Sequence, residues 1–310
     1  MAMENPVHLN ECGLPLNAIE WLETHHRSKL AEREQMIQDL QLGCDSRIVD
    51  AGCGPGLWTP LLARAIGSGG SILGVDVSAE ALVTARQRGI GQWYEKQVCY
   101  KQSSMEHLPV ANGSIHTIFS ANVSQYLPEP VRTFAALGRY LAPGGRLVVK
   151  DIDFGTIRFY NVDPALQARV FCARQRWEEQ RLREDYLFED SWVGSKLADY
   201  FRAAGYKDIQ EKCYRVVRHA PLAEDFRSYV QGIASWFVCE DAPFLIRADS
   251  ARWLTSFGNG DDSLLDQATF GYEETEFMVT GVWSGNPLRN YFDMHINVHR
   301  SVLDPEYAGY

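Results

Sequence analysis

The amino-acid sequence predicts an α/β fold with a doubly wound, mostly parallel sheet. Between residues 43 and 155, short β-rich apolar runs alternate with helical patterns, which is typical of a sheet covered on both faces. A glycine-rich turn joins the first strand to the first of these helices. We expect strands at 47–51, 71–77, 97–102, 115–121 and 146–152, and helices at 59–66, 78–88 and 131–141.

The segments that flank this core have a different pattern. An apolar stripe predicts one helix over 17–42, and Pro143-Gly144-Gly145 is expected to end the helix at 131–141. After the core we expect helices at 163–187 and 191–203, a strand at 208–218, an aromatic helical region at 222–268 and a final strand at 273–283. We interpret 156–205 as a helical insertion, and 206–310 as the remaining strands with a cap at 220–270. A separate C-terminal domain is disfavoured because no flexible linker precedes it.

Composition limits the class of protein. The formal net charge of −10 argues against binding to a nucleic-acid backbone. Seven scattered cysteines without a CxxC pair suit a reducing compartment better than a disulfide framework or a zinc site. No apolar signal core and no membrane-length apolar segment occur, so we expect a cytoplasmic protein that does not enter the membrane.

The glycine loop at 50–56 indicates the kind of ligand. Its glycines alternate, unlike the G-x-G-x-x-G spacing that binds a pyrophosphate, and Pro55 removes one N–H donor. Asp50 would repel a pyrophosphate but suits a ligand that carries an ammonium and a sulfonium. Asp76 ends the next strand, where a carboxylate can accept the hydroxyls of a ribose.

Four segments carry a family resemblance: Arg47–Gly56, Leu73–Val77, Ser103–Pro109 and Leu141–Val149. In these segments the chain resembles the class I S-adenosylmethionine-dependent methyltransferases, in the small-molecule, natural-product branch. The resemblance implies a seven-stranded Rossmann-like sheet, with the S-adenosylmethionine-binding core at 43–155, the remaining strands within 206–310 and an N-terminal helical lid at 1–42. It implies that S-adenosylmethionine is bound by Asp50, Gly52, Gly54, Gly56, Asp76, Val77, Ser104, Met105 and Asn122.

Candidate residues for the methyl acceptor follow from this topology. His25 and Trp21 share one face of the N-terminal helix, and Gln125 and Tyr126 follow the fourth strand. His25, Tyr126 and Asp151 are the catalytic candidates, and Trp21, His26, Gln125 and Trp236 are the candidates for acceptor binding. For His26 a packed core position is favoured. Asp151 with Asp153 does not define a metal site, and His295 and His299 are interpreted as solvated or packed, so no metal is expected.

The expected activity is methyl transfer to a small organic acceptor, a specialised metabolite of aromatic or apolar character, with S-adenosylhomocysteine as product. The acceptor atom can be oxygen, nitrogen or an electron-rich carbon such as an indole carbon. A homodimer is compatible with the sequence. Two alternatives are a nicotinamide-dependent oxidoreductase, disfavoured by the glycine spacing and Asp50, and a non-catalytic protein that binds the cofactor.

Overall fold

A single eight-stranded sheet organises the molecule. The computed structural model describes residues 10, 16–183, 190–238 and 244–284. The strand order is β3-β2-β1-β4-β5-β8-β6, and β7 pairs with the other side of β8. The strands are β1 (Arg47–Ala51), β2 (Ser71–Asp76), β3 (Val98–Gln102), β4 (Ile115–Ala121), β5 (Leu141–Ile152), β6 (Arg158–Tyr160), β7 (Tyr206–His219) and β8 (Gly271–Trp283). Because β8 runs antiparallel to β5, β6 and β7, it alone opposes the common direction of the described strands.

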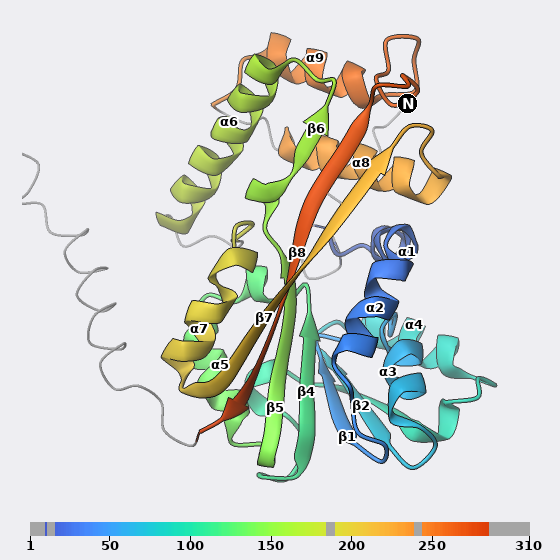
Figure 1. The fold of residues 1–310 in the computed structure, drawn as a ribbon, viewed down its shortest axis with the longest axis vertical. Coiled ribbons are helices and arrows are strands. Elements are labelled where there is room, and N and C mark those ends of the chain that lie inside the picture. Colours follow the sequence, from blue (N-terminus) through green and yellow to red (C-terminus); the bar gives the residue numbers. More distant parts are fainter. Residues whose placement is uncertain (1–9, 11–15, 184–189, 239–243, 285–310) are drawn as a thin grey trace, which may run out of the picture.

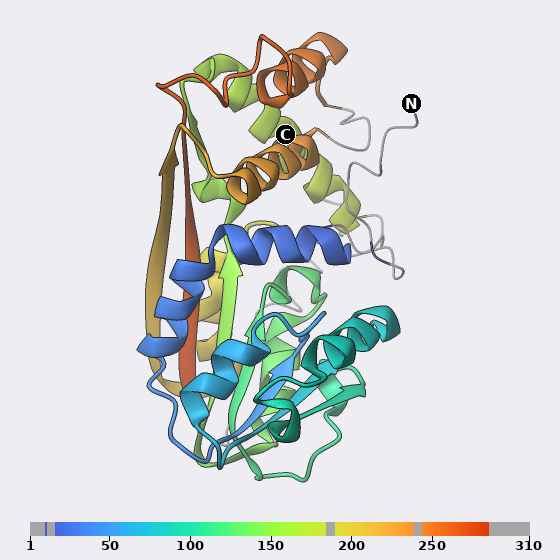
Figure 2. The same cartoon turned by 90° about the vertical axis from the view of Figure 1, so that its right-hand side faces the viewer.

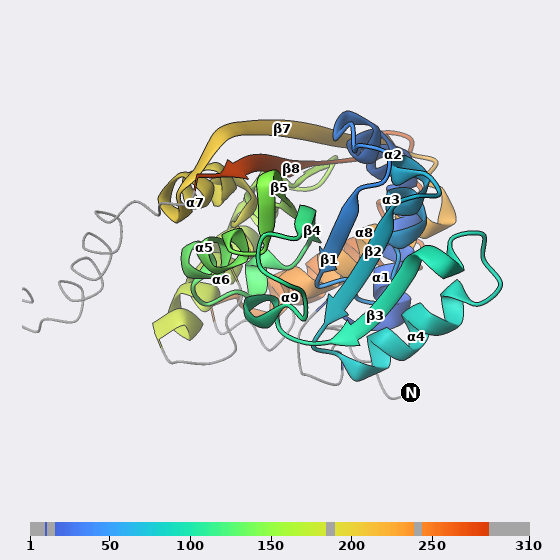
Figure 3. The ribbon, with the colours of Figure 1, turned by 90° about the horizontal axis from the view of Figure 1, so that it is seen from below.

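Helices cover both faces of the sheet (Figures 1 and 3). Residues of α2 and α3 form a core with one face, and residues of α5 and α7 form a core with the other. Such double coverage explains why the parallel strands are apolar in nearly continuous runs. The helices are α1 (Ile19–Ser28), α2 (Leu30–Asp39), α3 (Thr59–Ile66), α4 (Ala79–Gly89), α5 (Pro130–Gly138), α6 (Pro164–Arg183), α7 (Leu197–Ala204), α8 (Glu224–Phe237) and α9 (Arg247–Phe257).

A cap stands beyond the carboxyl ends of the central parallel strands. The long strands β7 and β8 extend past β5, and β6 continues the sheet beside the far end of β8. Helices α6, α8 and α9 pack around this extension, and α1 lies between α8 and the sheet domain (Figures 1 and 2). Ligands of open α/β sheets bind at the edge formed by the carboxyl ends of the parallel strands, here called the ligand edge. In this arrangement the ligand edge faces α1.

The predicted fold class is confirmed, and several element boundaries need correction. The predicted helix 17–42 is two helices, because Lys29 leaves the helical conformation at φ −128° and ψ 25°. Helix α5 ends at Gly138, and Pro143-Gly144-Gly145 lies within β5, where the pairing with β4 shifts register. The structure also adds the short strand β6 to the predicted seven.

The predicted insertion 156–205 is divided between two layers. Helix α6 lies in the cap, whereas α7 packs on α5 beside the sheet, and its Leu197 and Phe201 are fully buried there. Gly205, in the left-handed conformation at φ 94°, ends α7 as expected. Within the described residues, no helix has the length and apolar character needed to cross a membrane.

Candidate functional site

The principal cavity opens at the ends of β1, β2 and β4, beneath α1. Its volume of about 320 Å³ falls in the range of small-molecule sites. The loops after these parallel strands form its floor, as expected for the ligand edge of an α/β sheet. Seven of the residues predicted to bind cofactor line it: Gly52, Gly54, Asp76, Val77, Ser104, Met105 and Asn122.

The glycine loop has a conformation that side chains would prevent. Gly52, Gly54 and Gly56 all have positive φ, at 78°, 52° and 73°. A Cβ atom on Gly52 would lie 2.3 Å from Val123 Cγ2, and one on Gly56 would lie 2.7 Å from the Tyr100 hydroxyl. The nearest atom to a Cβ on Gly54 is Leu22 Cδ1 of α1, at 3.7 Å. Gly52 and Gly56 thus keep the turn tight, while the backbone of Gly54 faces the space beneath the lid.

Asp50 is a buried carboxyl with unused hydrogen-bonding capacity. Only 1% of the residue is exposed, and its Oδ2 atom has no hydrogen-bond partner among the described residues. Burial, and then the charge of Asp76, raises the pKa of Asp50 to about 8. A buried polar atom of this kind requires a reason, and a cationic ligand group at the glycine loop would supply its partner.

Asp76 joins the glycine loop to the next helix. Its Oδ2 accepts a hydrogen bond from Gly54 N at 2.7 Å, and its Oδ1 accepts one from Ser78 N at 2.9 Å. Asp76 also lines the cavity, so its carboxylate lies where a ligand hydroxyl can reach it. Along the same wall, Ser104 Oγ lies 3.3 Å from His107 Nδ1, and the Met105 side chain is buried. These residues form one continuous side of the cavity.

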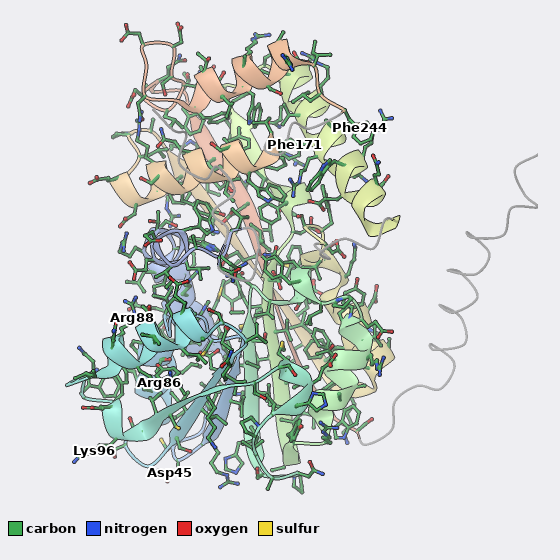
Figure 4. The ribbon with its side chains drawn as sticks, turned by 180° about the vertical axis from the view of Figure 1, so that it is seen from behind. Asp45, Arg86, Arg88, Lys96, Phe171 and Phe244 are labelled. Atoms are coloured by element: carbon green, nitrogen blue, oxygen red, sulfur yellow. The ribbon has the colours of Figure 1, made fainter. Side chains whose placement is uncertain are left out.

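Arg88 of α4 ties the lid to the glycine loop (Figure 4). Its Nε donates to the carbonyl oxygen of Pro55 at 3.1 Å, and its Nη2 donates to Glu23 of α1 at 2.5 Å. Because both contacts use one planar guanidinium, a displacement of α1 would disturb the glycine loop as well. The lid and the floor of the cavity are therefore mechanically connected.

Arg33 is a buried cation at the cavity that the sequence analysis missed. It is 2% exposed, lines the cavity, and its Nε has no hydrogen-bond partner among the described residues. Its Nη1 donates to His26 Nδ1 at 2.5 Å, and its guanidinium lies 4.9 Å from the Trp58 ring centre. The available signal was its position in the apolar stripe of 17–42, where a charged residue requires a partner.

The position of His26 corrects its assignment to acceptor binding. Its ring meets the edge of Trp58 at 6.1 Å, and it does not line the cavities described here. Burial, and then the charge of Arg33, lowers the pKa of His26 to about 3, so the ring is neutral and its Nδ1 accepts a hydrogen bond from Arg33. His26 therefore orients Arg33.

A small hollow continues from the cavity toward the cap. Its volume is about 30 Å³, and it shares His25, Asn122 and Tyr126 with the principal cavity. Its other lining is mostly apolar or aromatic and includes Leu16, Trp21, Gln125, Ile152, Phe154, Tyr229 and Ile233. Four predicted acceptor-side residues, namely Trp21, His25, Gln125 and Tyr126, are thus brought together at this hollow.

Four charged side chains, none of them predicted, form a buried ion cluster behind the hollow: Lys29, Lys150, Glu274 and Glu276. Glu276 Oε1 accepts from Lys150 at 2.6 Å and from Lys29 at 3.1 Å, and Lys29 also pairs with Glu274. Although burial acts to raise it, these two lysines hold the pKa of Glu276 well below its usual range. The available signal was the strand alternation that places Glu274 and Glu276 on one face of β8.

Cap and lid residues complete this cluster. Tyr229 of α8 donates to Glu274 Oε2 at 2.7 Å and accepts from Lys29 at 2.8 Å. The Tyr229 ring stacks on His25 at 5.1 Å and on Trp21 at 5.5 Å. Burial, and then the charges of Lys29 and Arg33, lowers the pKa of His25 well below its usual value. His25 is therefore neutral where it reaches the cavity.

Asp151 is placed as a structural carboxyl, which corrects its assignment as a catalytic residue. It is fully buried and lines neither cavity; its oxygens accept from the backbone N–H groups of Ser124 at 2.9 Å and Ile152 at 3.2 Å. Burial raises its pKa to about 7, opposed by the charge of Lys150. Its contact with Ser124 fixes the turn that carries Gln125 and Tyr126.

Trp236 belongs to the core of the cap, which corrects its assignment to acceptor binding. It is fully buried, stacks on Phe154 at 4.5 Å, and packs under the Arg174 guanidinium at 3.7 Å. The aromatic residues of α8 are therefore spaced to pack in the core of the cap. The described residues contain no group of three or more His, Cys, Asp or Glu placed to hold a metal ion. His295 and His299 lie outside the described residues.

Comparison with known proteins agrees with this geometry. Residues 49–149 match the family model described as a methyltransferase domain. This segment is a methyltransferase domain. It contains the glycine loop, Asp76, Ser104, Met105 and Asn122 of the cavity.

Curated relatives match this methyltransferase domain over different lengths. The methyltransferase GfsG of Streptomyces halstedii is 31% identical over 119 residues, which cover 38% of this chain and 42% of that protein. A demethylmenaquinone methyltransferase of Lactiplantibacillus plantarum is 28% identical over 203 residues, which cover 63% and 82% respectively. A solved structure from Bacillus halodurans C-125, described as a candidate methyltransferase, aligns with a TM-score of 0.50 at 14% identity. It covers 80% of this chain and 97% of its own, and it shows the shared fold.

Proposed function

We propose that this protein transfers a methyl group from S-adenosylmethionine to a small organic acceptor of flat, apolar character. The observation that carries the proposal is the buried, unsatisfied carboxyl of Asp50 beside a glycine loop of methyltransferase type. When bound, S-adenosylmethionine supplies a methyl group already activated by its sulfonium. The protein then has to orient the acceptor and exclude water.

Two buried side chains fit this cofactor at its methionine end: Arg33, which lines the cavity, and Asp50, which lies beside the glycine loop. Asp50 provides a carboxylate for the ammonium group, which would satisfy its Oδ2 atom. Arg33 provides a buried guanidinium whose free Nε can donate to the carboxylate of the methionine part. When a ligand ammonium ionises Asp50, the two side chains carry opposite charges, as a zwitterionic ligand group requires.

The opposite end of the cavity fits the nucleoside. We assign the ribose hydroxyls to the carboxylate of Asp76, which lines the cavity, while Val77, Ser104 and Met105 lie along the wall proposed for adenine. We assign Gly52, Gly54 and Gly56 to the backbone cradle and Asn122 to the junction with the acceptor hollow.

The acceptor is proposed to bind where the principal cavity meets the hollow beneath the cap, because the hollow alone, at about 30 Å³, is too small for an organic acceptor. Stacked rings of Trp21, Tyr229 and His25 line it, and such a wall binds flat ligands. Gln125 and Tyr126 supply polar groups on the sheet side. We propose His25 and Tyr126 as the residues that touch the acceptor near the transferred methyl group.

Labelled methyl transfer tests this function. The protein is incubated with methyl-labelled S-adenosylmethionine and a mixture of small metabolites, tRNA and protein, and the label is followed in each fraction. Label in the small-molecule fraction supports the proposal. Label that is confined to tRNA or protein overturns the choice of acceptor class, and the Asp76→Ala variant is the matched control for cofactor-dependent transfer.

A further inference from the structure

The buried ion cluster determines which hydrogen-bonding groups face the acceptor. We propose that the region where the principal cavity meets the hollow selects an acceptor that binds as an oxyanion, a phenolate or an enolate, over an amine of the same shape. This inference rests on the proposed function and deepens it, because it names the chemical class of the acceptor. Two groups carry it: His25 and Asn122, which line both the cavity and the hollow.

Lys29 determines which nitrogen of His25 carries the proton. Lys29 Nζ lies 3.0 Å from His25 Nε2, and Lys29 is held between the carboxylates of Glu274 and Glu276. Lys29 shares its three protons among these carboxylates, Tyr229 and His25. A proton on Nε2 would point at the ammonium, and Glu276 Oε1 is 3.8 Å from Nε2, so the Nε2 lone pair faces Lys29 and the ring proton lies on Nδ1. Nδ1 makes no hydrogen bond to another described residue. His25 consequently offers a donor to the ligand.

Lys150 fixes Asn122 in the same way. Its Nζ donates to Asn122 Oδ1 at 2.7 Å and to Glu276 Oε1 at 2.6 Å. The oxygen of the Asn122 amide therefore faces Lys150, and the NH₂ group remains available as a donor. Asn122 has φ 59°, a left-handed conformation that turns the chain at the end of β4 and brings the residue to the edge of the cavity. Lys29 and Lys150 thus orient two donors toward one region.

The charges around the hollow favour an anion as well. Lys29, Lys150 and Arg33 are buried cations, and Glu274 and Glu276 are the carboxylates of the cluster. Asp151 is the next carboxyl, but its oxygens are directed to backbone N–H groups. An ammonium at this junction would face the two N–H donors, with the buried lysines directly behind them, whereas an oxyanion would accept from both donors. The amide of Gln125 can present either its oxygen or its nitrogen.

A neutral His25 that donates from Nδ1 does not serve as a general base. The acceptor would instead lose its proton to water as it binds, and the donors would stabilise the resulting oxyanion. An oxyanion is the nucleophilic form of a hydroxyl, and a phenolate or enolate also activates its neighbouring carbon. The same site could therefore serve oxygen or carbon methylation, but not methylation of an amine.

A matched pair of probes tests the inference on the protein loaded with S-adenosylhomocysteine. 4-Nitrophenol and 4-nitroaniline have the same shape, and the ionised form of 4-nitrophenol is visible by its absorbance. We expect bound 4-nitrophenol to ionise at least about one pH unit below the free compound, a tenfold preference for the anion. We expect 4-nitroaniline to bind at least about tenfold more weakly, which corresponds to about 1.4 kcal/mol.

Two variants distinguish the effect of the His25 N–H donor from the effect of its aromatic ring. His25→Phe retains a stacking ring but removes the N–H group, so the ionisation shift should disappear. His25→Gln retains a donor and should preserve part of the shift. Equal binding of 4-nitroaniline, an unshifted titration, no binding of 4-nitrophenol or an unchanged shift in His25→Phe would each overturn the inference. Failure of S-adenosylhomocysteine itself to bind would instead overturn the proposed function.

Discussion

Replacing Asp50 by asparagine should stabilise the free protein while it weakens cofactor binding. Burial, and then the charge of Asp76, raises the pKa of Asp50 to about 8 in the folded protein, whereas an aspartate in an unfolded chain has a pKa of about 3.9. Protonated Asp50 therefore stabilises the folded protein fully below about pH 4, and this stabilisation is lost as the pH rises toward 8. Because pH 7 lies roughly three units above the unfolded pKa, the free energy of unfolding is lower at pH 7 by about 4 kcal/mol as an upper bound.

Urea unfolding measures this effect directly. We expect Asp50→Asn to raise the free energy of unfolding by about 2–4 kcal/mol at pH 7 and by about 1 kcal/mol at pH 5. Asp50→Ala is the control for lost side-chain packing. In parallel, calorimetric titration should show that Asp50→Asn binds S-adenosylhomocysteine more than about tenfold more weakly. A variant that is no more stable than the wild type, or whose stability difference is the same at both pH values, would refute the reasoning about the buried carboxyl.

Three further substitutions test the site and the cap. Asp76→Ala should weaken S-adenosylhomocysteine affinity by more than about tenfold in calorimetry; unchanged affinity would show that the ribose lies elsewhere. Gly52→Ala should cost roughly 1–3 kcal/mol in thermal unfolding, because φ is 78° and the new Cβ would lie 2.3 Å from Val123. An unshifted melting temperature would contradict the loop geometry. Trp236→Ala should cost about 3–5 kcal/mol in urea unfolding but leave S-adenosylhomocysteine affinity unchanged. Weaker binding of S-adenosylhomocysteine by the folded variant would show that Trp236 belongs to the ligand site.

The sheet and cofactor loop were predictable because their determinants are local in the sequence. Alternating apolar runs define strands without tertiary information, and the glycines at 52, 54 and 56 adopt the positive φ angles that only glycine accommodates easily. Helix α3 begins and ends at the predicted residues, and Ser78 caps α4 by accepting from Ala81 N at 2.9 Å. Each of these features depends on neighbours within a few positions.

The features that escaped prediction depend on residues far apart in the chain. Lys29 lies at the break between α1 and α2, and its ammonium pairs with Glu274 and Glu276, almost 250 positions later. The aromatic residues of α8, including Trp236, keep helical spacing whether that face of the helix meets a ligand or a core. The spacing alone therefore could not show whether Trp236 binds the acceptor. Asp151 occupies the ligand edge as expected, yet backbone N–H groups take up its oxygens. Partners of buried polar groups become visible only when the fold brings them together.

Calorimetric titration of the protein with S-adenosylhomocysteine, beside a titration with NAD, tests the central claim most directly. We expect stoichiometric binding of S-adenosylhomocysteine, lower affinity in Asp50→Asn and in Asp76→Ala, and no binding of NAD. Binding of NAD without binding of S-adenosylhomocysteine would contradict the assignment of the cavity to a methyl donor.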